Sequence, residues 1–269
     1  MKIGLAQLNS RQNKEANLKA ATRAVDRLAE QSVDLIVLPE MFNFHGLDDA
    51  YEQQAEPIPG PASDWAGEQA RRHGVFLHCG SFAERRGDRI FNTSMVFDRQ
   101  GRELARYSKI HLFDVSLPDG LEYRESSTIS AGADVVTCEV EGVTLGLAIC
   151  YDLRFPQLFH ALADEGAQVF VLPAAFTVAT GISHWEPLVR ARAIENGCYM
   201  AACGQWGAYA RGRQTYGHSL LVDPWGTVVA QCREGVATVV ADLDLDYLAD
   251  VRRRMPVQHH RRRDIFEGK

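Results

Sequence analysis

The feature that most constrains the fold is a repeated alternation of short apolar runs with segments whose apolar residues recur at helical spacing. Residues 2–9 (KIGLAQLN) form one apolar run, and residues 13–30 place alanine, valine and leucine one helical turn apart. Residues 34–38 (DLIVL) are apolar after the first residue and stop at a proline, which is typical of a strand covered on both faces. The pattern therefore predicts buried sheets covered by helices.

The same alternation continues along the chain, with glycine-containing turns that favour hairpins. It predicts further helices at residues 62–73, 155–164 and 183–195. It predicts further strands at residues 75–83, 91–98, 103–107, 135–139, 143–149, 168–172, 199–203, 218–223, 227–231 and 237–242. Because no low-complexity linker divides the 269 residues, we expect one α/β domain over residues 1–269, a sandwich of mixed sheets.

Charge and hydropathy exclude several classes of partner. The 35 acidic residues outnumber the 29 lysines and arginines and give a formal net charge of -6, which argues against nucleic-acid binding. No segment reaches the roughly 18 to 20 uninterrupted apolar residues that a membrane helix needs. The first seven residues turn polar too early for a signal peptide, so we expect a cytoplasmic protein without a membrane partner.

The cysteines and histidines do not indicate a metal site. Six cysteines are present, and none forms a CxxC pair with another. They are interpreted as reduced thiols, at positions Cys79, Cys138, Cys150, Cys198, Cys203 and Cys232. Neither a GxGxxG nor a Walker motif is present, so we expect no metal and no cofactor.

Cys150 follows the predicted strand 143–149, and Pro156 suits the first turn of the next helix. Ligands of open α/β sheets bind at the carboxyl ends of strands, and a nearby helix N-terminus would favour the thiolate of such a cysteine. A cysteine that ends an apolar strand can equally belong to the core. This segment alone leaves both interpretations open.

Two charged residues occupy similar positions. Glu40 follows the strand 34–38, where burial would raise its pKa and suit it to act as a general base, and Lys109 follows the strand 103–107. Taken singly, each is better interpreted as an exposed loop residue. Together with Cys150 they supply a nucleophile, a proton acceptor and a cation for an oxyanion, which is what acyl transfer requires.

Three segments resemble the signature motifs of the nitrilase, or carbon-nitrogen hydrolase, superfamily: LPE at Glu40, SKIH at Lys109 and ICYDLRFP at Cys150. The resemblance covers essentially the whole chain and implies a four-layer α-β-β-α sandwich. It implies Glu40 as general base, Lys109 as transition-state stabiliser and Cys150 as nucleophile. Glu125 resembles the additional active-site glutamate of the family, and the Tyr151 N–H is expected to help bind the oxyanion.

Residues 184–196, 216–219 and 223–226 resemble the amidase branch that includes deaminated glutathione amidase and ω-amidase, and they are more similar to the former. The expected activity is hydrolysis of a small carboxylate-bearing α-keto acid amide to an acid and ammonia through a cysteine thioester. The alternatives are ω-amidase activity on 2-oxoglutaramate, transfer of the acyl group to another acceptor, and a catalytically silent binding protein.

Arg154 is the cation nearest to Cys150 in sequence, and it either binds the substrate carboxylate or pairs with an acid such as Asp152. Four aromatic residues near strand ends are expected either to line the pocket or to pack in the core: His111, Phe42, Phe113 and Phe176.

The resemblance also implies a homodimer or higher homo-oligomer. The helix 183–195 could supply the contact surface through its apolar residues Trp185, Leu188, Val189 and Ile194. Residues 245–269 are predicted to form a C-terminal helix and a basic tail in subunit contact.

Overall fold

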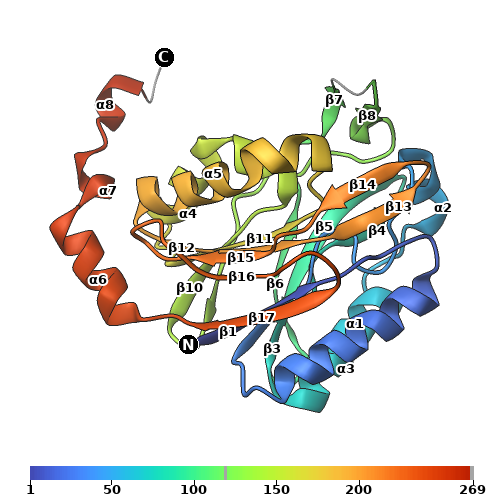
Figure 1. Ribbon diagram of the computed structural model, residues 1–269, viewed down its shortest axis with the longest axis horizontal. Coiled ribbons are helices and arrows are strands. Elements are labelled where there is room, and N and C mark those ends of the chain that lie inside the picture. Colours follow the sequence, from blue (N-terminus) through green and yellow to red (C-terminus); the bar gives the residue numbers. More distant parts are fainter. Residues whose placement is uncertain (118–119, 267–269) are drawn as a thin grey trace.

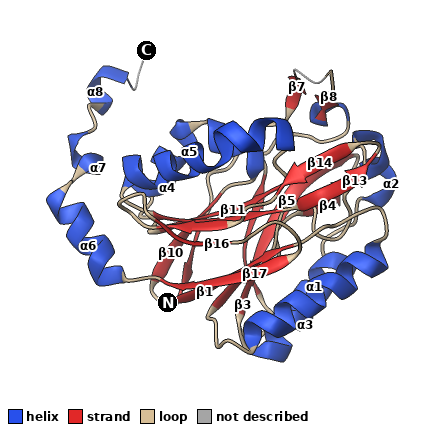
Figure 2. Ribbon diagram, viewed as in Figure 1, coloured by secondary structure: helices blue, strands red, loops and turns tan. Residues whose placement is uncertain are grey.

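The computed structural model describes residues 1–117 and 120–266. Two β-sheets pack face to face, and helices cover the outer face of each sheet (Figures 1 and 2). The expected four-layer α-β-β-α sandwich is thereby confirmed. At its centre, β1 (Lys2–Gln7) of the first sheet lies against β12 (Tyr199–Gly204) of the second.

The first sheet has the strand order β17-β1-β2-β3-β5-β4, with β6 also paired to β5. Strands β1, β2 and β3 are parallel, and the remaining pairs are antiparallel. Helices α1 (Lys14–Ala29) and α3 (Pro61–His73) cover its outer face. The other strands are β2 (Leu35–Val37), β3 (Phe76–His78), β4 (Phe82–Arg86), β5 (Arg89–Phe97), β6 (Glu103–Ser108) and β17 (Ala237–Asp242).

The second sheet has the order β16-β15-β12-β11-β10-β9, with a parallel centre formed by β10, β11 and β12. Helices α4 (Pro156–Asp164) and α5 (Val178–Asn196) cover it. Its other strands are β9 (Thr137–Val140), β10 (Val143–Leu147), β11 (Val169–Ala174), β15 (Leu220–Val222) and β16 (Val228–Gln231).

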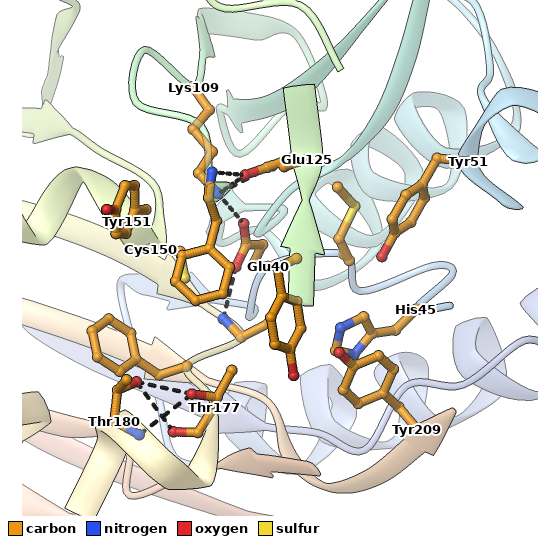
Figure 3. A pocket seen from close by; sticks show the side chains of 15 residues that line it. Glu40, His45, Tyr51, Lys109, Glu125, Cys150, Tyr151, Thr177, Thr180 and Tyr209 are labelled. Carbon is orange, nitrogen blue, oxygen red and sulfur yellow. Dashed lines mark hydrogen bonds and ion pairs between the residues drawn. The ribbon is translucent and has the colours of Figure 1, made fainter. Parts of the chain in front are cut away.

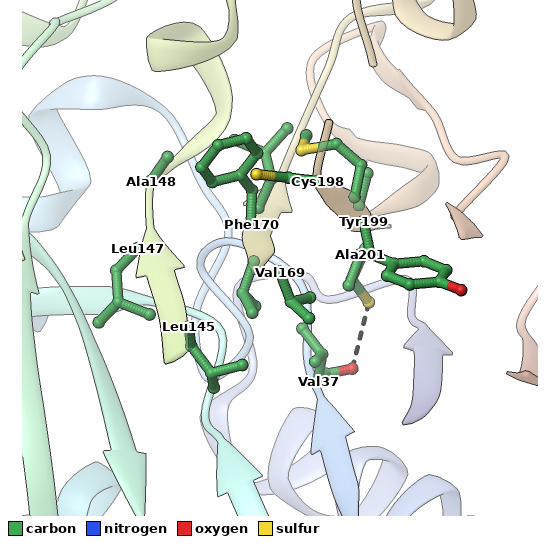
Figure 4. Packing of buried hydrophobic residues seen from close by; sticks show 14 of the residues in the cluster. Val37, Leu145, Leu147, Ala148, Val169, Phe170, Cys198, Tyr199 and Ala201 are labelled. Atoms are coloured by element: carbon green, nitrogen blue, oxygen red, sulfur yellow. Dashed lines mark hydrogen bonds between the residues drawn. The ribbon is translucent and has the colours of Figure 1, made fainter. Parts of the chain in front are cut away.

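The largest core lies between the two sheets, and Figure 4 shows part of it. Alternate residues of a strand point to opposite faces, so Leu35 and Val37 enter this core while Ile36 packs against the helices of the first layer. Both faces of β2 are therefore buried. This double burial is the reason that residues 34–38 read as a continuous apolar run rather than as an alternating one.

The remaining elements are short or lie at the edges of the sandwich. Two hairpins are formed by β7 (Asp114–Ser116) with β8 (Glu122–Arg124), and by β13 (Trp206–Ala210) with β14 (Arg213–Tyr216). The short helices are the 3-10 helices η1 (Asp48–Ala50), η2 (Glu125–Ser127) and η3 (Cys150–Arg154), and α2 (Tyr51–Gln54). Helices α6 (Leu245–Arg254), α7 (Val257–His260) and α8 (Arg263–Phe266) form an arm at one end of the molecule (Figure 1).

Two predicted boundaries were wrong. The strand predicted at 75–83 is divided into β3 and β4, because Gly80 adopts φ +70° and its Cα approaches the Pro39 carbonyl so closely that a Cβ would lie 2.0 Å from that oxygen. The helix predicted at 183–195 begins at Val178, where the Thr177 side chain caps it by accepting a hydrogen bond from the Thr180 N–H.

The apolar residues of α5 that were expected at a subunit contact divide between the core and the surface. Trp185 and Val189 are fully buried and belong to the core, so they are not available for a subunit contact. Ile182 and Ile194, 66% and 45% exposed, are the apolar residues that α5 presents to solvent.

Candidate active site

Four chemically active side chains come from separate segments and meet at one end of the sandwich (Figure 3). Glu40 follows β2, Lys109 follows β6, Cys150 begins η3 directly after β10, and Glu125 begins η2 after β8. All four residues are buried. Segments that follow strands of both sheets and of the β7–β8 hairpin thus bring together groups that lie far apart in sequence.

The Lys109 ammonium lies between the two carboxylates. Its Nζ is 3.1 Å from Glu40 Oε1 and 2.8 Å from Glu125 Oε2. The Cys150 thiol and the Glu40 carboxylate line the same cavity, and each shifts the pKa of the other. The thiol, the carboxylate and the ammonium that the sequence singled out therefore share one cavity.

Cys150 sits on a tight turn with the unusual backbone angle φ +47° for a residue with a side chain. Asp152, which is fully buried, holds this turn in place. Its Oδ2 accepts hydrogen bonds from the Ile149 N–H at 2.8 Å and from the Tyr107 hydroxyl at 2.7 Å. The turn after β10 is thereby fastened to β6, the strand that leads to Lys109.

Burial raises the pKa of the Cys150 thiol well above its ordinary value, and the neighbouring Glu40 charge raises it further. The expectation that a helix N-terminus would favour the thiolate was wrong, because the segment after Cys150 is a five-residue 3-10 helix in a buried, negatively charged setting. The resting thiol is protonated, so its activation requires a base.

The two carboxylates are shifted in opposite directions. Burial by itself would raise the pKa of Glu40, but the Lys109 charge and hydrogen bonds from Cys150, Lys109 and Asn92 bring it below its ordinary value. This corrects the expectation of a raised pKa. Burial, assisted by the Glu40 charge, raises the pKa of Glu125. Of the two carboxylates, Glu40 is consequently the one whose charged form is favoured, as a proton acceptor beside the thiol would require.

Lys109 remains a cation despite its burial. Burial by itself would lower the pKa of Lys109, yet the negative charges of Glu125 and Glu40 raise it well above the ordinary value. The ammonium therefore supplies a fixed positive charge next to Cys150.

The sequence analysis missed Asn92 and Gln205, which hold Glu40 in place. Asn92, on β5, lies with its Nδ2 2.8 Å from Glu40 Oε1, and Gln205 Nε2 donates to the Glu40 carbonyl at 2.9 Å. The Ala175 N–H also donates to Glu40 Oε2 at 2.7 Å. The available signal for Asn92 was its polar amide side chain within the predicted strand segment 90–97, because a buried polar side chain needs hydrogen-bond partners.

The cavity has a volume of about 70 Å³ and is lined on several sides by aromatic residues. Tyr151, Phe113 and Phe176, which the sequence suggested as site or wall residues, do line it. So do residues that the sequence did not single out: Met41, His45, Tyr51, Tyr123, Ala175, Thr177, Thr180 and Tyr209.

Three residues that the sequence suggested for the pocket do not line this cavity: Phe42, His111 and Arg154. Phe42 points into the core of the first helical layer, where it contacts the Trp65 ring at a centroid distance of 5.2 Å. His111 stacks on Phe155 at 3.7 Å and lies with its Nδ1 2.7 Å from Asp152 Oδ1.

Arg154 lies against the rings of two residues that line the cavity. Its guanidinium carbon is 5.8 Å from the centre of the Tyr151 ring and 5.2 Å from that of Phe176, and its Nη2 is 3.3 Å from His184 Nδ1. The alternative pairing of Arg154 with Asp152 is not formed, since Asp152 binds Tyr107, His111 and the backbone.

In residues 1–117 and 120–266, no group of three or more His, Cys, Asp or Glu side chains is placed so that it could hold a metal ion. Within the same ranges, no helix has the length and apolar character needed to cross a membrane.

The sandwich and the buried thiol, carboxylate and ammonium define the class of protein, a thiol enzyme for acyl transfer on an α-β-β-α scaffold. More particularly, the chain belongs to the carbon-nitrogen hydrolase family, whose pattern matches residues 2–253.

Individual relatives agree with this assignment. The deaminated glutathione amidase of Synechocystis is 40% identical over 95% of this chain and 96% of its own length. The ω-amidase of Danio rerio is 36% identical over 98% of this chain and 96% of its own. The crystal structure of the nitrilase and fragile histidine triad fusion protein of Caenorhabditis elegans superposes with a TM-score of 0.90 at 38% identity, over 98% of this chain and 65% of that protein.

Proposed function

We propose that this chain hydrolyses the amide of an α-keto acid, with deaminated glutathione as its substrate, through a thioester on Cys150. The observation that carries the proposal is one buried cavity that holds the Cys150 thiol, the Glu40 carboxylate and the Lys109 ammonium, whose Nζ lies 3.1 Å from Glu40 Oε1. The similarity to deaminated glutathione amidases supports the choice of substrate.

In the first half of the reaction, Glu40 takes the proton of the Cys150 thiol while the sulfur attacks the amide carbonyl carbon. The carbonyl oxygen becomes an oxyanion, which Lys109 and the Tyr151 N–H stabilise. Collapse of this intermediate breaks the C–N bond as Glu40 passes its proton to the leaving nitrogen. The product is an acyl thioester on Cys150 and a free amine.

In the second half, Glu40 accepts a proton from a water molecule, and the resulting hydroxide attacks the thioester carbon. Lys109 and the Tyr151 N–H stabilise the second oxyanion. Cys150 leaves as a thiolate and recovers its proton from Glu40, which returns the site to its starting state. Glu125, paired with Lys109 at 2.8 Å, positions the ammonium throughout.

The nature of the leaving nitrogen depends on the substrate. A primary amide such as 2-oxoglutaramate releases ammonia, as the sequence analysis expects. In deaminated glutathione the nitrogen belongs to a dipeptide, so the released product is a peptide amine instead.

The decisive experiment measures kcat/KM for deaminated glutathione and 2-oxoglutaramate side by side on the same preparation. We expect the higher value for deaminated glutathione. A higher value for 2-oxoglutaramate would identify an ω-amidase, which the 36% identity to such an enzyme makes the second candidate. Absence of hydrolysis of both would contradict the proposed function.

We also propose that the chain forms a homodimer through the face that carries α5 and the C-terminal arm. This face exposes Ile194, Trp225 and Met255, which lie around one shallow pocket and are 45%, 54% and 46% exposed. Apolar side chains gathered in this way are typical of a surface that another protein covers. The arm is held beside α5 by Arg261, which hydrogen-bonds Asn196, and extends the same face.

A further inference from the structure

The Asp152 carboxylate connects two of the segments that form the active site. It is fully buried. Its Oδ2 accepts hydrogen bonds from the Ile149 N–H at 2.8 Å and from the Tyr107 hydroxyl at 2.7 Å. Its Oδ1 accepts from the His111 N–H at 3.0 Å, and His111 Nδ1 lies 2.7 Å from the same oxygen. Because a carboxylate only accepts, that ring nitrogen carries its hydrogen, and the four bonds fill the two oxygens.

These partners flank the two reacting groups along the chain. Ile149 directly precedes Cys150. Tyr107 stands two residues before Lys109, and His111 stands two residues after it. One carboxylate therefore fastens the chain on both sides of the ammonium to the residue that leads into the thiol.

The same residue closes the turn that carries the nucleophile. The Asp152 N–H donates to the Ile149 carbonyl at 3.0 Å, while the side chain accepts from the Ile149 N–H. Together these bonds hold Cys150 at φ +47° and fix the backbone from which the Tyr151 N–H projects. In the proposed mechanism that N–H and the Lys109 ammonium stabilise the oxyanion. Both supports of the oxyanion are thus held by one side chain.

The connection between the two segments has no slack. Tyr107 and Asp152 have no exposed surface, so bulk solvent does not replace a hydrogen bond that is lost between them. Burial and the Asp152 charge raise the pKa of Tyr107 well above its ordinary value, so the phenol keeps its proton and remains the donor.

We infer that Asp152 is a positioning residue that sets the Lys109 ammonium and the Tyr151 N–H at the right distance from the Cys150 sulfur. This inference rests on the proposed function, and it adds a residue that acts on the transition state without touching the substrate. Asp152 does not line the cavity, and it takes no part in the proton transfers.

The first test variant is Asp152→Asn, which keeps the shape of the side chain and turns one oxygen into an NH2 group. The Tyr107 hydroxyl and the His111 ring can reverse their roles toward that group, but a backbone N–H cannot. Either the Ile149 N–H or the His111 N–H therefore loses its acceptor. We expect kcat for amide hydrolysis to fall about a hundredfold, the effect of a small misplacement of reacting groups, with KM within about threefold.

A second measurement separates positioning from activation of the thiol. Iodoacetamide alkylates Cys150 by displacing iodide from a saturated carbon, so this reaction needs the sulfur but no oxyanion support. Mass spectrometry of the Cys150 peptide measures its rate. In Asp152→Asn the alkylation should be no more than about threefold slower, because removal of a negative charge does not disfavour a thiolate.

Two further variants complete the comparison. Tyr107→Phe keeps the Asp152 carboxylate and removes one of its four bonds, so kcat should fall about tenfold and the alkylation rate should not change. Asp98→Asn is the matched control. Asp98 is 5% exposed and also accepts backbone N–H bonds, from Gln100 at 2.8 Å and from Arg102 at 2.9 Å, but it lies in the turn between β5 and β6. Its replacement should change neither rate.

The outcomes distinguish this role from the proposed function. With an active unmodified protein, an unchanged kcat in Asp152→Asn would overturn the positioning role alone. Alkylation that slows as much as kcat would also overturn it, because Asp152 would then act on the thiol or on the fold. If circular dichroism shows that Asp152→Asn does not fold, an unchanged kcat in Tyr107→Phe overturns the role. If the unmodified protein hydrolyses neither deaminated glutathione nor 2-oxoglutaramate, the proposed function fails and the positioning role with it.

Discussion

The side-chain amide of Asn92 bridges the two buried carboxylates, with its Nδ2 2.8 Å from Glu40 Oε1 and 3.2 Å from Glu125 Oε1. The Lys109 ammonium makes the same bridge at 3.1 Å and 2.8 Å. One neutral donor and one cation therefore hold two acids side by side in one buried site. This arrangement is what allows Glu40 to stay ionised beside Glu125.

Replacement of Asn92 by Ala should move the pH dependence of the reaction. The Asn92 hydrogen bond stabilises the charged form of Glu40 and so lowers its pKa, and its loss raises that pKa. Because the reaction needs ionised Glu40, activity is lost as the pH falls through this pKa. We expect the acidic limb of kcat/KM against pH to shift to higher pH, with a loss of roughly tenfold at neutral pH. An unchanged acidic limb would show that Asn92 does not tune Glu40.

Cys150→Ala should abolish amide hydrolysis, because no other described thiol lines the cavity. Circular dichroism first checks that the variant is folded. Chromatography then measures the product that it forms. Cys138→Ala, in the edge strand β9, is the matched control and should keep full activity. Turnover by Cys150→Ala would contradict a thioester route.

Lys109→Ala should lower kcat by at least about a hundredfold, the typical effect of removing an oxyanion donor. It also leaves two buried carboxylates without their cation, so the free energy of unfolding should fall by about 3 kcal/mol. Urea unfolding at neutral pH measures the second effect. Lys19→Ala, whose side chain is 67% exposed in an ion pair with Glu15, should change neither quantity.

Trp225→Glu should disrupt the proposed dimer, since it places a charge in the centre of the apolar face. We expect sedimentation velocity to give a dimer for the unmodified chain at micromolar concentration and a smaller species for the variant. Val236→Glu is the control, because Val236 is 63% exposed but lies beside α1, on the other side of the sandwich. A monomeric unmodified chain would contradict the dimer.

Much of the fold follows from local sequence patterns. The apolar runs at 2–9 and 34–38 and the helical spacing at 13–30 correspond to β1, β2 and α1 within a few residues. Cys150, Glu40 and Lys109 could be singled out because each ends a strand, and parallel strands deliver their carboxyl ends to one edge. The hairpin β13–β14 was not predicted because its two short strands mix aromatic, small and charged residues without a clear alternation. Its place at the cavity depends on contacts with the loop after β2.

Chain order and the spacing of apolar residues thus determine which segments become strands, how they are layered and which strand ends carry reactive groups. Only the tertiary structure decides how deeply those groups are buried and which charges lie next to them. Phe42 and Phe176 are both phenylalanines near a strand end. Phe42 packs against Trp65 of α3, whereas Phe176 lines the cavity. The opposite pKa shifts of Glu40 and Glu125 arise from burial and from neighbours far away in sequence. Such effects depend on distance in space, which no local pattern encodes.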